Sequence, residues 1–167
     1  MQNPRSVSHQ LNALTETIIG AAIEVHRELG PGMLERAYER CLALELLGRG
    51  LKIERQKLLP LTYKAQLLNY GYRLDLLVED AVVVEVKSTE KLERVHLSQL
   101  LSYLRFSGCH VGLLMNFNVP WLTRDGIRRV VLDLPEQSTF LHRTFSSRSC
   151  VLGALRVLCV QRRRLSF

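Results

Sequence analysis

The chain has few cysteines, and their spacing fits neither a zinc site nor a disulfide framework. There are four in 167 residues, and no two of them form a Cys-x-x-Cys pair. Structural zinc sites are usually built from such closely spaced pairs, and small secreted domains from dense cysteine patterns. We therefore expect a reducing, cytoplasmic setting. The four are Cys41, Cys109, Cys150 and Cys159.

Long apolar runs and several catalytic motifs are also missing. The first ten residues are polar, and no uninterrupted apolar run reaches the roughly 18 residues of a membrane span. Neither a signal peptide nor a membrane partner is therefore expected. No glycine-rich phosphate loop is present, and Ser88 and His96 have no third member of a triad. Hydrolase chemistry through serine or cysteine is thus unsupported.

Acidic residues are absent after Glu136, and this absence accounts for most of the net charge of +7. Six of the 23 basic residues lie after Glu136, so the remaining 17 nearly balance the 16 acidic residues. The body of the chain therefore carries no general nucleic-acid signal. Five basic residues nearer the centre leave two interpretations open, a binding groove or a solvated face. They are Lys52, Arg55, Lys57, Lys64 and Arg73.

The length and the apolar content of 47% are sufficient for one domain with its own core. We expect a flexible N-terminus over residues 1–13, a domain over 14–135 and a basic tail over 136–167. The role of the tail stays open between a packed helix, an arm that touches phosphates and an extension without a role.

Apolar periodicity predicts three helices and several strands. Helices are expected over residues 14–29, 33–47 and 92–107. Their arrangement between the strands predicts an α/β fold with a mixed central sheet flanked by helices. The strands are expected over residues 51–61, 62–68, 72–78, 82–88, 110–117 and 127–134.

Two charges interrupt the most apolar of these strands. Glu85 and Lys87 share one face of it, because successive side chains of a strand point to opposite faces. Asp75 lies in the preceding strand, and the intervening Glu79-Asp80 predicts a turn that folds the two strands into a hairpin. The three side chains then converge. Two carboxylates at one place suit Mg²⁺, which takes oxygen ligands and keeps several waters.

Short motifs resemble those of a nuclease family. Gly32, Glu35 and Tyr38 fit the signature of the GxxExxY proteins, a branch of the PD-(D/E)XK nuclease superfamily. The preceding stretch, residues 26–32 (HRELGPG), is similar to the lead-in of that branch. Two further motifs, described next, bring the number to four, and four motifs in the right order are far more specific than any one of them.

The other two motifs belong to the wider superfamily. Asp75 and Glu85-x-Lys87 match its D…(D/E)xK core, and Gln99 with Tyr103 resembles the QxxxY motif of lambda-exonuclease-like members. The resemblance covers residues 14–134, and it implies a restriction-endonuclease-like fold. Leu74 stands where the superfamily name has proline, a departure that many members share.

The resemblance also implies roles for eight side chains and one backbone carbonyl. Asp75 and Glu85 would hold one Mg²⁺ or Mn²⁺ with the Val86 carbonyl, and Lys87 would orient or deprotonate a bound water. Glu35 would contact the metal or a water, while Gln99 and Tyr103 would contact a water, the Glu85 carboxylate or a phosphate. Tyr38 and His26 are auxiliary candidates.

Structural alternatives stay open for these residues. Glu85 and Lys87 also suit a cross-strand ion pair, and Gln99 and Tyr103 also suit helix packing. Glu35 also suits the positive end of a helix dipole, Tyr38 a core position, and His26 the last turn of a helix.

These features predict a metal-dependent nuclease that hydrolyses phosphodiester bonds, in DNA rather than RNA. The alternative is a catalytically silent nuclease-fold module that binds nucleic acid or a protein partner. A third hypothesis is an interaction protein whose basic tail does the binding. A domain this small offers little groove for an extended duplex, which suggests a homodimer or a larger complex.

Overall fold

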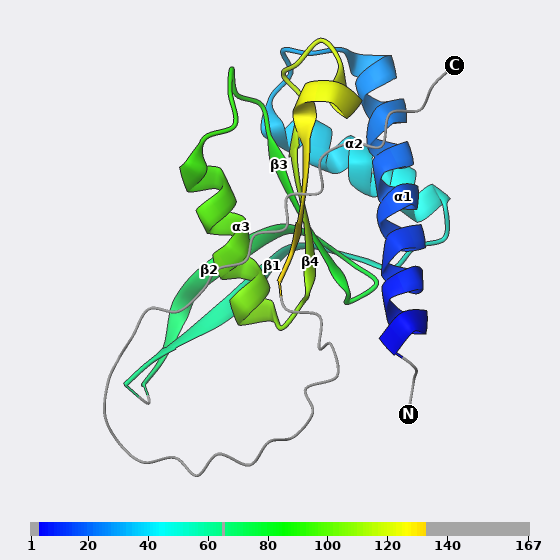
Figure 1. The fold of residues 1–167 in the computed structure, drawn as a ribbon. Coiled ribbons are helices and arrows are strands. Elements are labelled where there is room, and N and C mark those ends of the chain that lie inside the picture. The colour runs from blue at the N-terminus through cyan, green and yellow to red at the C-terminus, as the bar shows by residue number, and fades with distance from the viewer. Residues whose placement is uncertain (1–3, 65, 133–167) are drawn as a thin grey trace.

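The computed structural model describes residues 4–64 and 66–132, and these form a five-stranded sheet with helices against both faces (Figure 1). In chain order the elements are α1 (Pro4–Leu29), α2 (Glu35–Gly48), β1 (Ile53–Tyr63), β2 (Gln66–Val78), β3 (Val82–Lys87), α3 (Arg94–Ser107), β4 (Val111–Asn116), the π-helical turn η1 (Leu122–Gly126) and β5 (Ile127–Val131).

The sheet is mixed, and its strands lie side by side in chain order from β1 to β5. Neighbouring strands are antiparallel except β3 and β4, which are parallel. A parallel pair needs a crossover connection, and α3 supplies it. The predicted α/β architecture, with a mixed central sheet flanked by helices, is confirmed.

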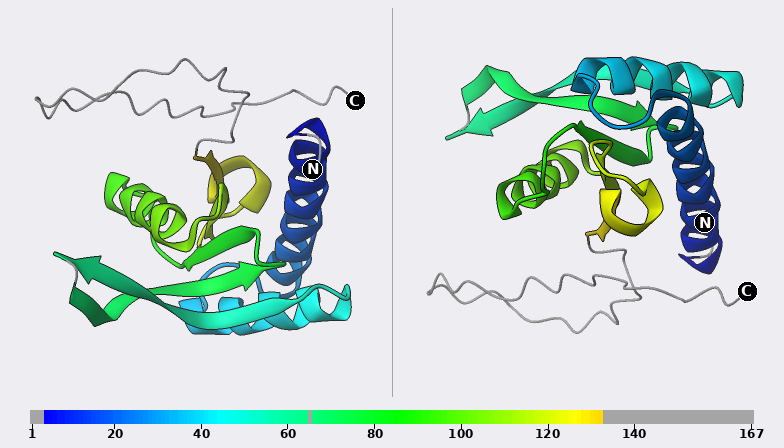
Figure 2. Two further views of the ribbon diagram at one scale, coloured as in Figure 1. Left: turned by 90° about the horizontal axis from the view of Figure 1, so that it is seen from below. Right: turned by 90° about the horizontal axis from the view of Figure 1, so that it is seen from above.

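Two hydrophobic clusters attach the helices to the sheet, and Figure 2 shows α3 apart from α1 and α2. Val84 and Val86 of β3 lie in the cluster formed with α1 and α2. Val83 lies in the cluster formed with α3. Because side chains alternate along a strand, Glu85 and Lys87 belong to the face that α3 covers.

α1 begins at Pro4 rather than at residue 14, so residues 4–13 are helical where the sequence predicted a flexible N-terminus. Proline is tolerated in the first turn of a helix, where its missing N–H is not needed. Leu11 is buried in the cluster formed with α1 and α2. Apolar burial therefore extends the helix toward the N-terminus, beyond the point where the strongest periodicity begins.

The long β1–β2 hairpin corrects the prediction of a separate strand over residues 62–68. β2 is continuous from Gln66 to Val78, and it pairs with β1 over its whole length. Gly71, which looks like a turn residue, lies inside β2 beside a register shift near Pro60. A Cβ at Gly71 would lie 1.5 Å from the Leu59 carbonyl oxygen. Glycine is thus required there by a close backbone approach, not by a turn.

The turn between β2 and β3 agrees with its prediction. Glu79 and Asp80 have φ values of 52° and 51°, and the Ala81 N–H donates to the Val78 carbonyl at 3.0 Å. Two successive residues with positive φ are the mark of a two-residue hairpin turn that matches the twist of the strands. This turn fixes the register that the prediction for Asp75 and Glu85 needs.

The remaining elements match their predictions closely. α2, α3, β3 and β4 are confirmed, with ends that differ by one or two residues. β5 ends at Val131 rather than residue 134, and the predicted basic tail over 136–167 lies outside the described residues. Within residues 4–64 and 66–132, Cys41 and Cys109 are free thiols. None of the helices described is long and apolar enough to cross a membrane.

Candidate active site

The predicted carboxylates lie where β2 separates from β3. Backbone pairing between these strands ends at Leu76 and Val84, so Asp75 and Glu85 are the next residues on either side. The Val86 N–H donates to the Asp75 carboxylate at 2.9 Å. The Asp75 side chain thus accepts a backbone N–H at the point where the pairing of the two strands has ended. The separation of the strands leaves room for polar side chains inside an otherwise apolar sheet.

Glu85 is the most constrained charged group at this place. Its side chain is 3% exposed, and Oε1 accepts a hydrogen bond from Lys87 Nζ at 2.7 Å. Oε2 is buried and has no hydrogen-bond partner among the described residues. Burial, and then the charge of Asp75, raise the pKa of Glu85 to about 7. A buried carboxylate oxygen without a partner is costly, and such groups mark functional sites.

Lys87 remains the ammonium form next to Glu85. Burial acts to lower its pKa, but the hydrogen bond and the charge of Glu85, with Glu35 and Asp75 behind them, outweigh burial and raise it. A protonated lysine donates hydrogen bonds and cannot accept a proton. Lys87 is therefore a fixed positive charge in the resting site.

Asp75 is half-buried between two groups of polar side chains. Burial is the main cause that raises its pKa, and the charge of Glu39 acts in the same direction. The hydrogen bond from Val86, the charge of Lys87 and the bond from Gln56 partly offset the rise in pKa. The charge of Asp75 thus raises the pKa of Glu85, as a nearby anion does when too little positive charge lies between the two groups.

A second network, on the α2 side of Asp75, was not predicted from the sequence. Gln56 Nε2 donates to Glu39 Oε2 at 2.8 Å and to Asp75 Oδ1 at 3.2 Å. The guanidinium of Arg55 contacts Glu39 Oε1 through Nε at 3.0 Å. Glu39 is buried, and the amide of Gln56 connects it to the predicted metal ligand.

An irregularity in β1 and β2 brings Gln56 to this position. Gln56 has φ of 50°, which is uncommon for a residue other than glycine. Opposite it, the alternation of β2 is broken, since Leu74 packs in the α3 cluster and Leu76 in the α1–α2 cluster. No periodic pattern indicates such a position, so the only sequence signal was a glutamine within a strand.

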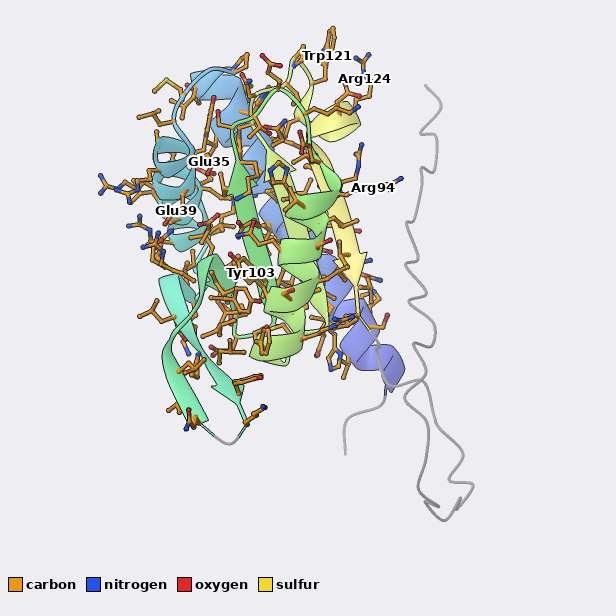
Figure 3. All side chains as sticks on the ribbon, turned by 90° about the vertical axis from the view of Figure 1, so that its left-hand side faces the viewer. Glu35, Glu39, Arg94, Tyr103, Trp121 and Arg124 are labelled. Atoms are coloured by element: carbon orange, nitrogen blue, oxygen red, sulfur yellow. The ribbon has the colours of Figure 1, made fainter. Side chains whose placement is uncertain are left out.

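Glu35 lies at the site, whereas Tyr38 does not. Figure 3 shows Glu35 on α2, across the sheet from Tyr103 on α3. Glu35 Oε1 accepts the Ser88 N–H at 3.2 Å, and its charge contributes to the raised pKa of Glu85. The Tyr38 hydroxyl instead donates to the Gly30 carbonyl at 2.6 Å and accepts the Met33 N–H at 3.1 Å.

Tyr38 is therefore placed as a structural residue. Its ring is fully buried and stacks on Phe117 with centroids 4.5 Å apart. The hydroxyl fastens the loop that leads into α2. These contacts fit the core alternative for Tyr38 rather than an auxiliary role, and three helical residues turn its side chain about 60° away from that of Glu35.

Gln99 and Tyr103 form a pair on α3. Gln99 Nε2 donates to the Tyr103 hydroxyl, and among the described residues no hydrogen bond joins either side chain to a carboxylate of the site. Burial, followed by the charge of Glu85, raises the pKa of Tyr103 to about 12. Tyr103 thus lies within electrostatic reach of Glu85 and keeps its proton.

His26 lies at the end of α1, where its Nε2 is 2.8 Å from the Val119 carbonyl oxygen. This bond ties α1 to the loop that follows β4. The contact fits the structural alternative for His26 rather than an auxiliary role among the carboxylates.

The donor set of the site fits one divalent cation. Among the described residues no three His, Cys, Asp or Glu side chains are grouped closely enough to hold a metal. Asp75 and Glu85 nevertheless offer hard oxygen ligands, including the unpartnered Oε2 of Glu85. A cation that keeps several waters or takes a backbone carbonyl needs only such a pair. It would also offset the charge of Asp75, which raises the pKa of Glu85.

Comparison with known protein families agrees with this geometry. The sequence profile of the PD-(D/E)XK nuclease superfamily matches residues 12–130, which run from α1 into β5. Comparisons with curated proteins and with solved structures gave no match. The matched region spans well over half of the chain and contains every carboxylate of the site. The chain therefore belongs to the PD-(D/E)XK nuclease superfamily.

Proposed function

We propose that this protein is a metal-dependent nuclease that hydrolyses phosphodiester bonds, with DNA as its substrate. The observation that carries the proposal is Glu85, a buried carboxylate with an open oxygen beside Asp75 and Lys87. A structural ion pair needs no third charge, and it leaves no buried oxygen without a partner. Nucleases of this superfamily generally use divalent metals. We assign the chain to the GxxExxY branch through Gly32, Glu35 and Tyr38.

Asp75 and Glu85 are the residues that would hold Mg²⁺ or Mn²⁺. When bound, such a metal polarises a phosphodiester and lowers the pKa of a bound water. Asp75 enters this role already oriented, because Val86 and Gln56 each donate to one of its oxygens. Glu85 is oriented by Lys87 through Oε1, which leaves Oε2 open.

Lys87 stabilises negative charge in this proposal. Because its pKa is raised, it holds its proton and donates from Nζ to a phosphate oxygen as charge builds there. The alternative that Lys87 removes a proton from water requires it to lose its own proton first. Glu35 supports the site from α2 through the Ser88 N–H, and its carboxylate can accept a hydrogen bond from a bound water.

Gln99 and Tyr103 contribute from α3. The Tyr103 hydroxyl keeps its proton at neutral pH, so it can donate to a phosphate oxygen. Gln99 orients that hydroxyl. Both roles are weaker than those of Lys87, because neither side chain is charged.

Cleavage assays test the proposal directly. Labelled single-stranded DNA, duplex DNA and RNA are incubated with the full chain in Mg²⁺, Mn²⁺ or EDTA. Lys87→Ala and Glu85→Gln are compared with Arg27→Ala, an exposed ion-paired arginine on α1. We expect metal-dependent cleavage of DNA that both site variants lose and Arg27→Ala keeps.

Two results would contradict it. Cleavage that persists in both site variants would indicate a contaminant. No cleavage of any substrate, together with binding of nucleic acid, would favour the catalytically silent alternative.

A further inference from the structure

Five basic residues bear on the question of a binding groove, and they fall into two groups. Lys52, Arg55 and Lys57 each form an ion pair, with Asp80, Glu39 and Glu54 respectively, and are accounted for by the fold. Arg36 and Arg73 form no ion pair within residues 4–64 and 66–132. The sequence left open whether the central basic residues line a groove or a solvated face. The ion pairs now divide these residues into those bonded within the fold and those available to a ligand.

Arg36 and Arg73 line the same small hollow, although one lies on α2 and the other on β2. The hollow has a volume of about 100 Å³, and its other lining residues are Glu35, Glu39, Gln56 and Asp75. Both arginines are exposed, whereas Glu39 is buried and Asp75 half-buried. The carboxylates therefore form the floor of the hollow and the arginines its rim.

Neither arginine has an ion pair among the described residues, and two of the three carboxylates that line the hollow already have donors on both oxygens. Both oxygens of Glu39 are bonded, by Arg55 and by Gln56. Both oxygens of Asp75 are bonded too, by Gln56 and by the Val86 N–H. Each guanidinium has five N–H donors in a planar fork, which suits the oxygens of a phosphate. Within the part of the chain that the structure describes, the network around Gln56 thus leaves both guanidinium groups at the rim without an acidic partner.

We propose that Arg36 and Arg73 form a clamp for one backbone phosphate, adjacent to the phosphate that is cut. This inference rests on the proposed function, because it needs the neighbouring phosphate at Asp75 and Glu85. The hollow is far smaller than the ~300 Å³ of an ordinary ligand pocket, so it has no room for a base. The clamp therefore sets the position of the strand and does not read its sequence.

The β1–β2 hairpin next to the hollow carries positive charge. Apart from the ion-paired Arg55 and Lys57, the sequence from Arg55 to Leu74 contains two basic residues, Lys64 and Arg73, and no acidic one. Lys64, at the far end of the β1–β2 hairpin, is exposed and lies over the Tyr63 ring at 5.4 Å from its centroid. A strand held by the clamp would thus continue along a basic hairpin, which attracts a nucleic-acid backbone.

The test compares two double variants that remove the same charge. Arg36→Ala/Arg73→Ala removes the clamp, whereas Arg27→Ala/Lys52→Ala removes two ion-paired cations elsewhere. Affinity of the full chain for labelled duplex DNA is measured in EDTA at several salt concentrations, so no cleavage occurs. We expect the clamp variant to bind about tenfold more weakly or worse, and its salt slope to fall by about 1, the value for one phosphate contact. The control should stay within about twofold of wild type.

Equal losses in both double variants, or none in either, would overturn the clamp. Arg36→Lys/Arg73→Lys adds a check, since it keeps the charge but not the fork, so the salt slope should persist while affinity falls. The outcome is separable from that of the proposed function. Metal-dependent cleavage with unchanged binding by the clamp variant contradicts only the clamp. Clamp-dependent binding without cleavage contradicts only the nuclease.

Discussion

Two buried glutamates, Glu39 on α2 and Glu85 on β3, differ in how completely their oxygens are bonded. Glu39 has partners on both oxygens, supplied by Arg55 and Gln56. Glu85 has a partner on only one, Lys87, and its other oxygen is buried without any among the described residues. Both side chains are almost inaccessible, with 5% and 3% exposed.

Burial alone therefore does not distinguish a structural acid from a functional one. A buried carboxylate with all its partners stabilises the position of its neighbours, and Glu39 does this for Gln56. A buried carboxylate oxygen without a partner is unfavourable, so a ligand that bonds to it lowers the free energy of the folded protein. Asp75 lies between the two, bonded to Gln56 on one side and repelled by Glu85 on the other.

Activity should separate the two glutamates most strongly. Glu85→Gln removes a metal-ligating charge, so we expect cleavage to fall by about 10³-fold or more, which corresponds to about 4 kcal/mol. Glu39→Gln leaves Asp75, Glu85 and Lys87 in place, and we expect a loss of about tenfold or less. Single-turnover cleavage rates in saturating Mn²⁺ measure both. Similar losses in the two variants would mean that the open oxygen has no special role.

The pH dependence of stability should show the second largest difference. The pKa of Glu85 is raised from 4.5 to about 7, so the folded protein holds this proton more tightly than the unfolded chain does. The resulting stability is fully present below pH 4.5 and is lost as pH rises to 7. It amounts to roughly 3 kcal/mol.

Urea unfolding in EDTA at several pH values measures this effect. Other carboxyl groups also titrate, so the useful quantity is the free energy of unfolding of wild type minus that of Glu85→Gln. We expect this difference to fall between pH 4.5 and pH 7 and then to level off. Parallel curves for the two proteins would contradict the raised pKa of Glu85.

At a single pH, the loss in free energy of unfolding should be larger for the Glu39 variant than for the Glu85 variant, which is the reverse of the order for activity. At pH 8, Glu39→Gln weakens a buried contact with Arg55, and we expect it to lower the free energy of unfolding by about 1–2 kcal/mol. Glu85→Gln removes a buried charge that the fold accommodates poorly, so its free energy of unfolding should be unchanged or higher. Thermal unfolding in EDTA gives both values. A larger loss for Glu85→Gln would make Glu85 the structural residue.

The sequence predicts the arrangement at Glu85 well, for a simple physical reason. Alternation along β3 places Glu85 and Lys87 on one face, and the Glu79-Asp80 turn fixes the register that brings Asp75 opposite. Both effects are local, and both are encoded in short stretches of residues. The roles of these side chains in catalysis stay predictions for the assays above.

The arrangement at Glu39 depends on contacts that no local pattern encodes. In the sequence, Glu39 is one of several acidic residues on a helix. Only the folded chain brings Gln56 and Arg55 of β1 into contact with it. Tyr38 fits its motif, yet its hydroxyl bonds the loop before α2 because of where Phe117 packs. The prediction also divided β2 at Gly71, since a glycine needed for close backbone approach cannot be told from one needed for a turn.

Gln56 allows the smallest but most specific test of this difference. At φ of 50° glycine is less strained than alanine, so Gln56→Gly should be more stable than Gln56→Ala by about 1 kcal/mol. At the next residue, Lys57, no positive φ occurs, and glycine should instead be less stable than alanine by about 0.5–1 kcal/mol. Each pair removes the same side-chain contacts, so the comparison isolates the backbone. Chemical unfolding of the four variants gives the two differences. If alanine is favoured at both positions, Gln56 does not hold the left-handed conformation. The hydrogen bonds from Gln56 to Glu39 and Asp75 would then be lost, and with them the reason that Arg36 and Arg73 have no acidic partner among the described residues.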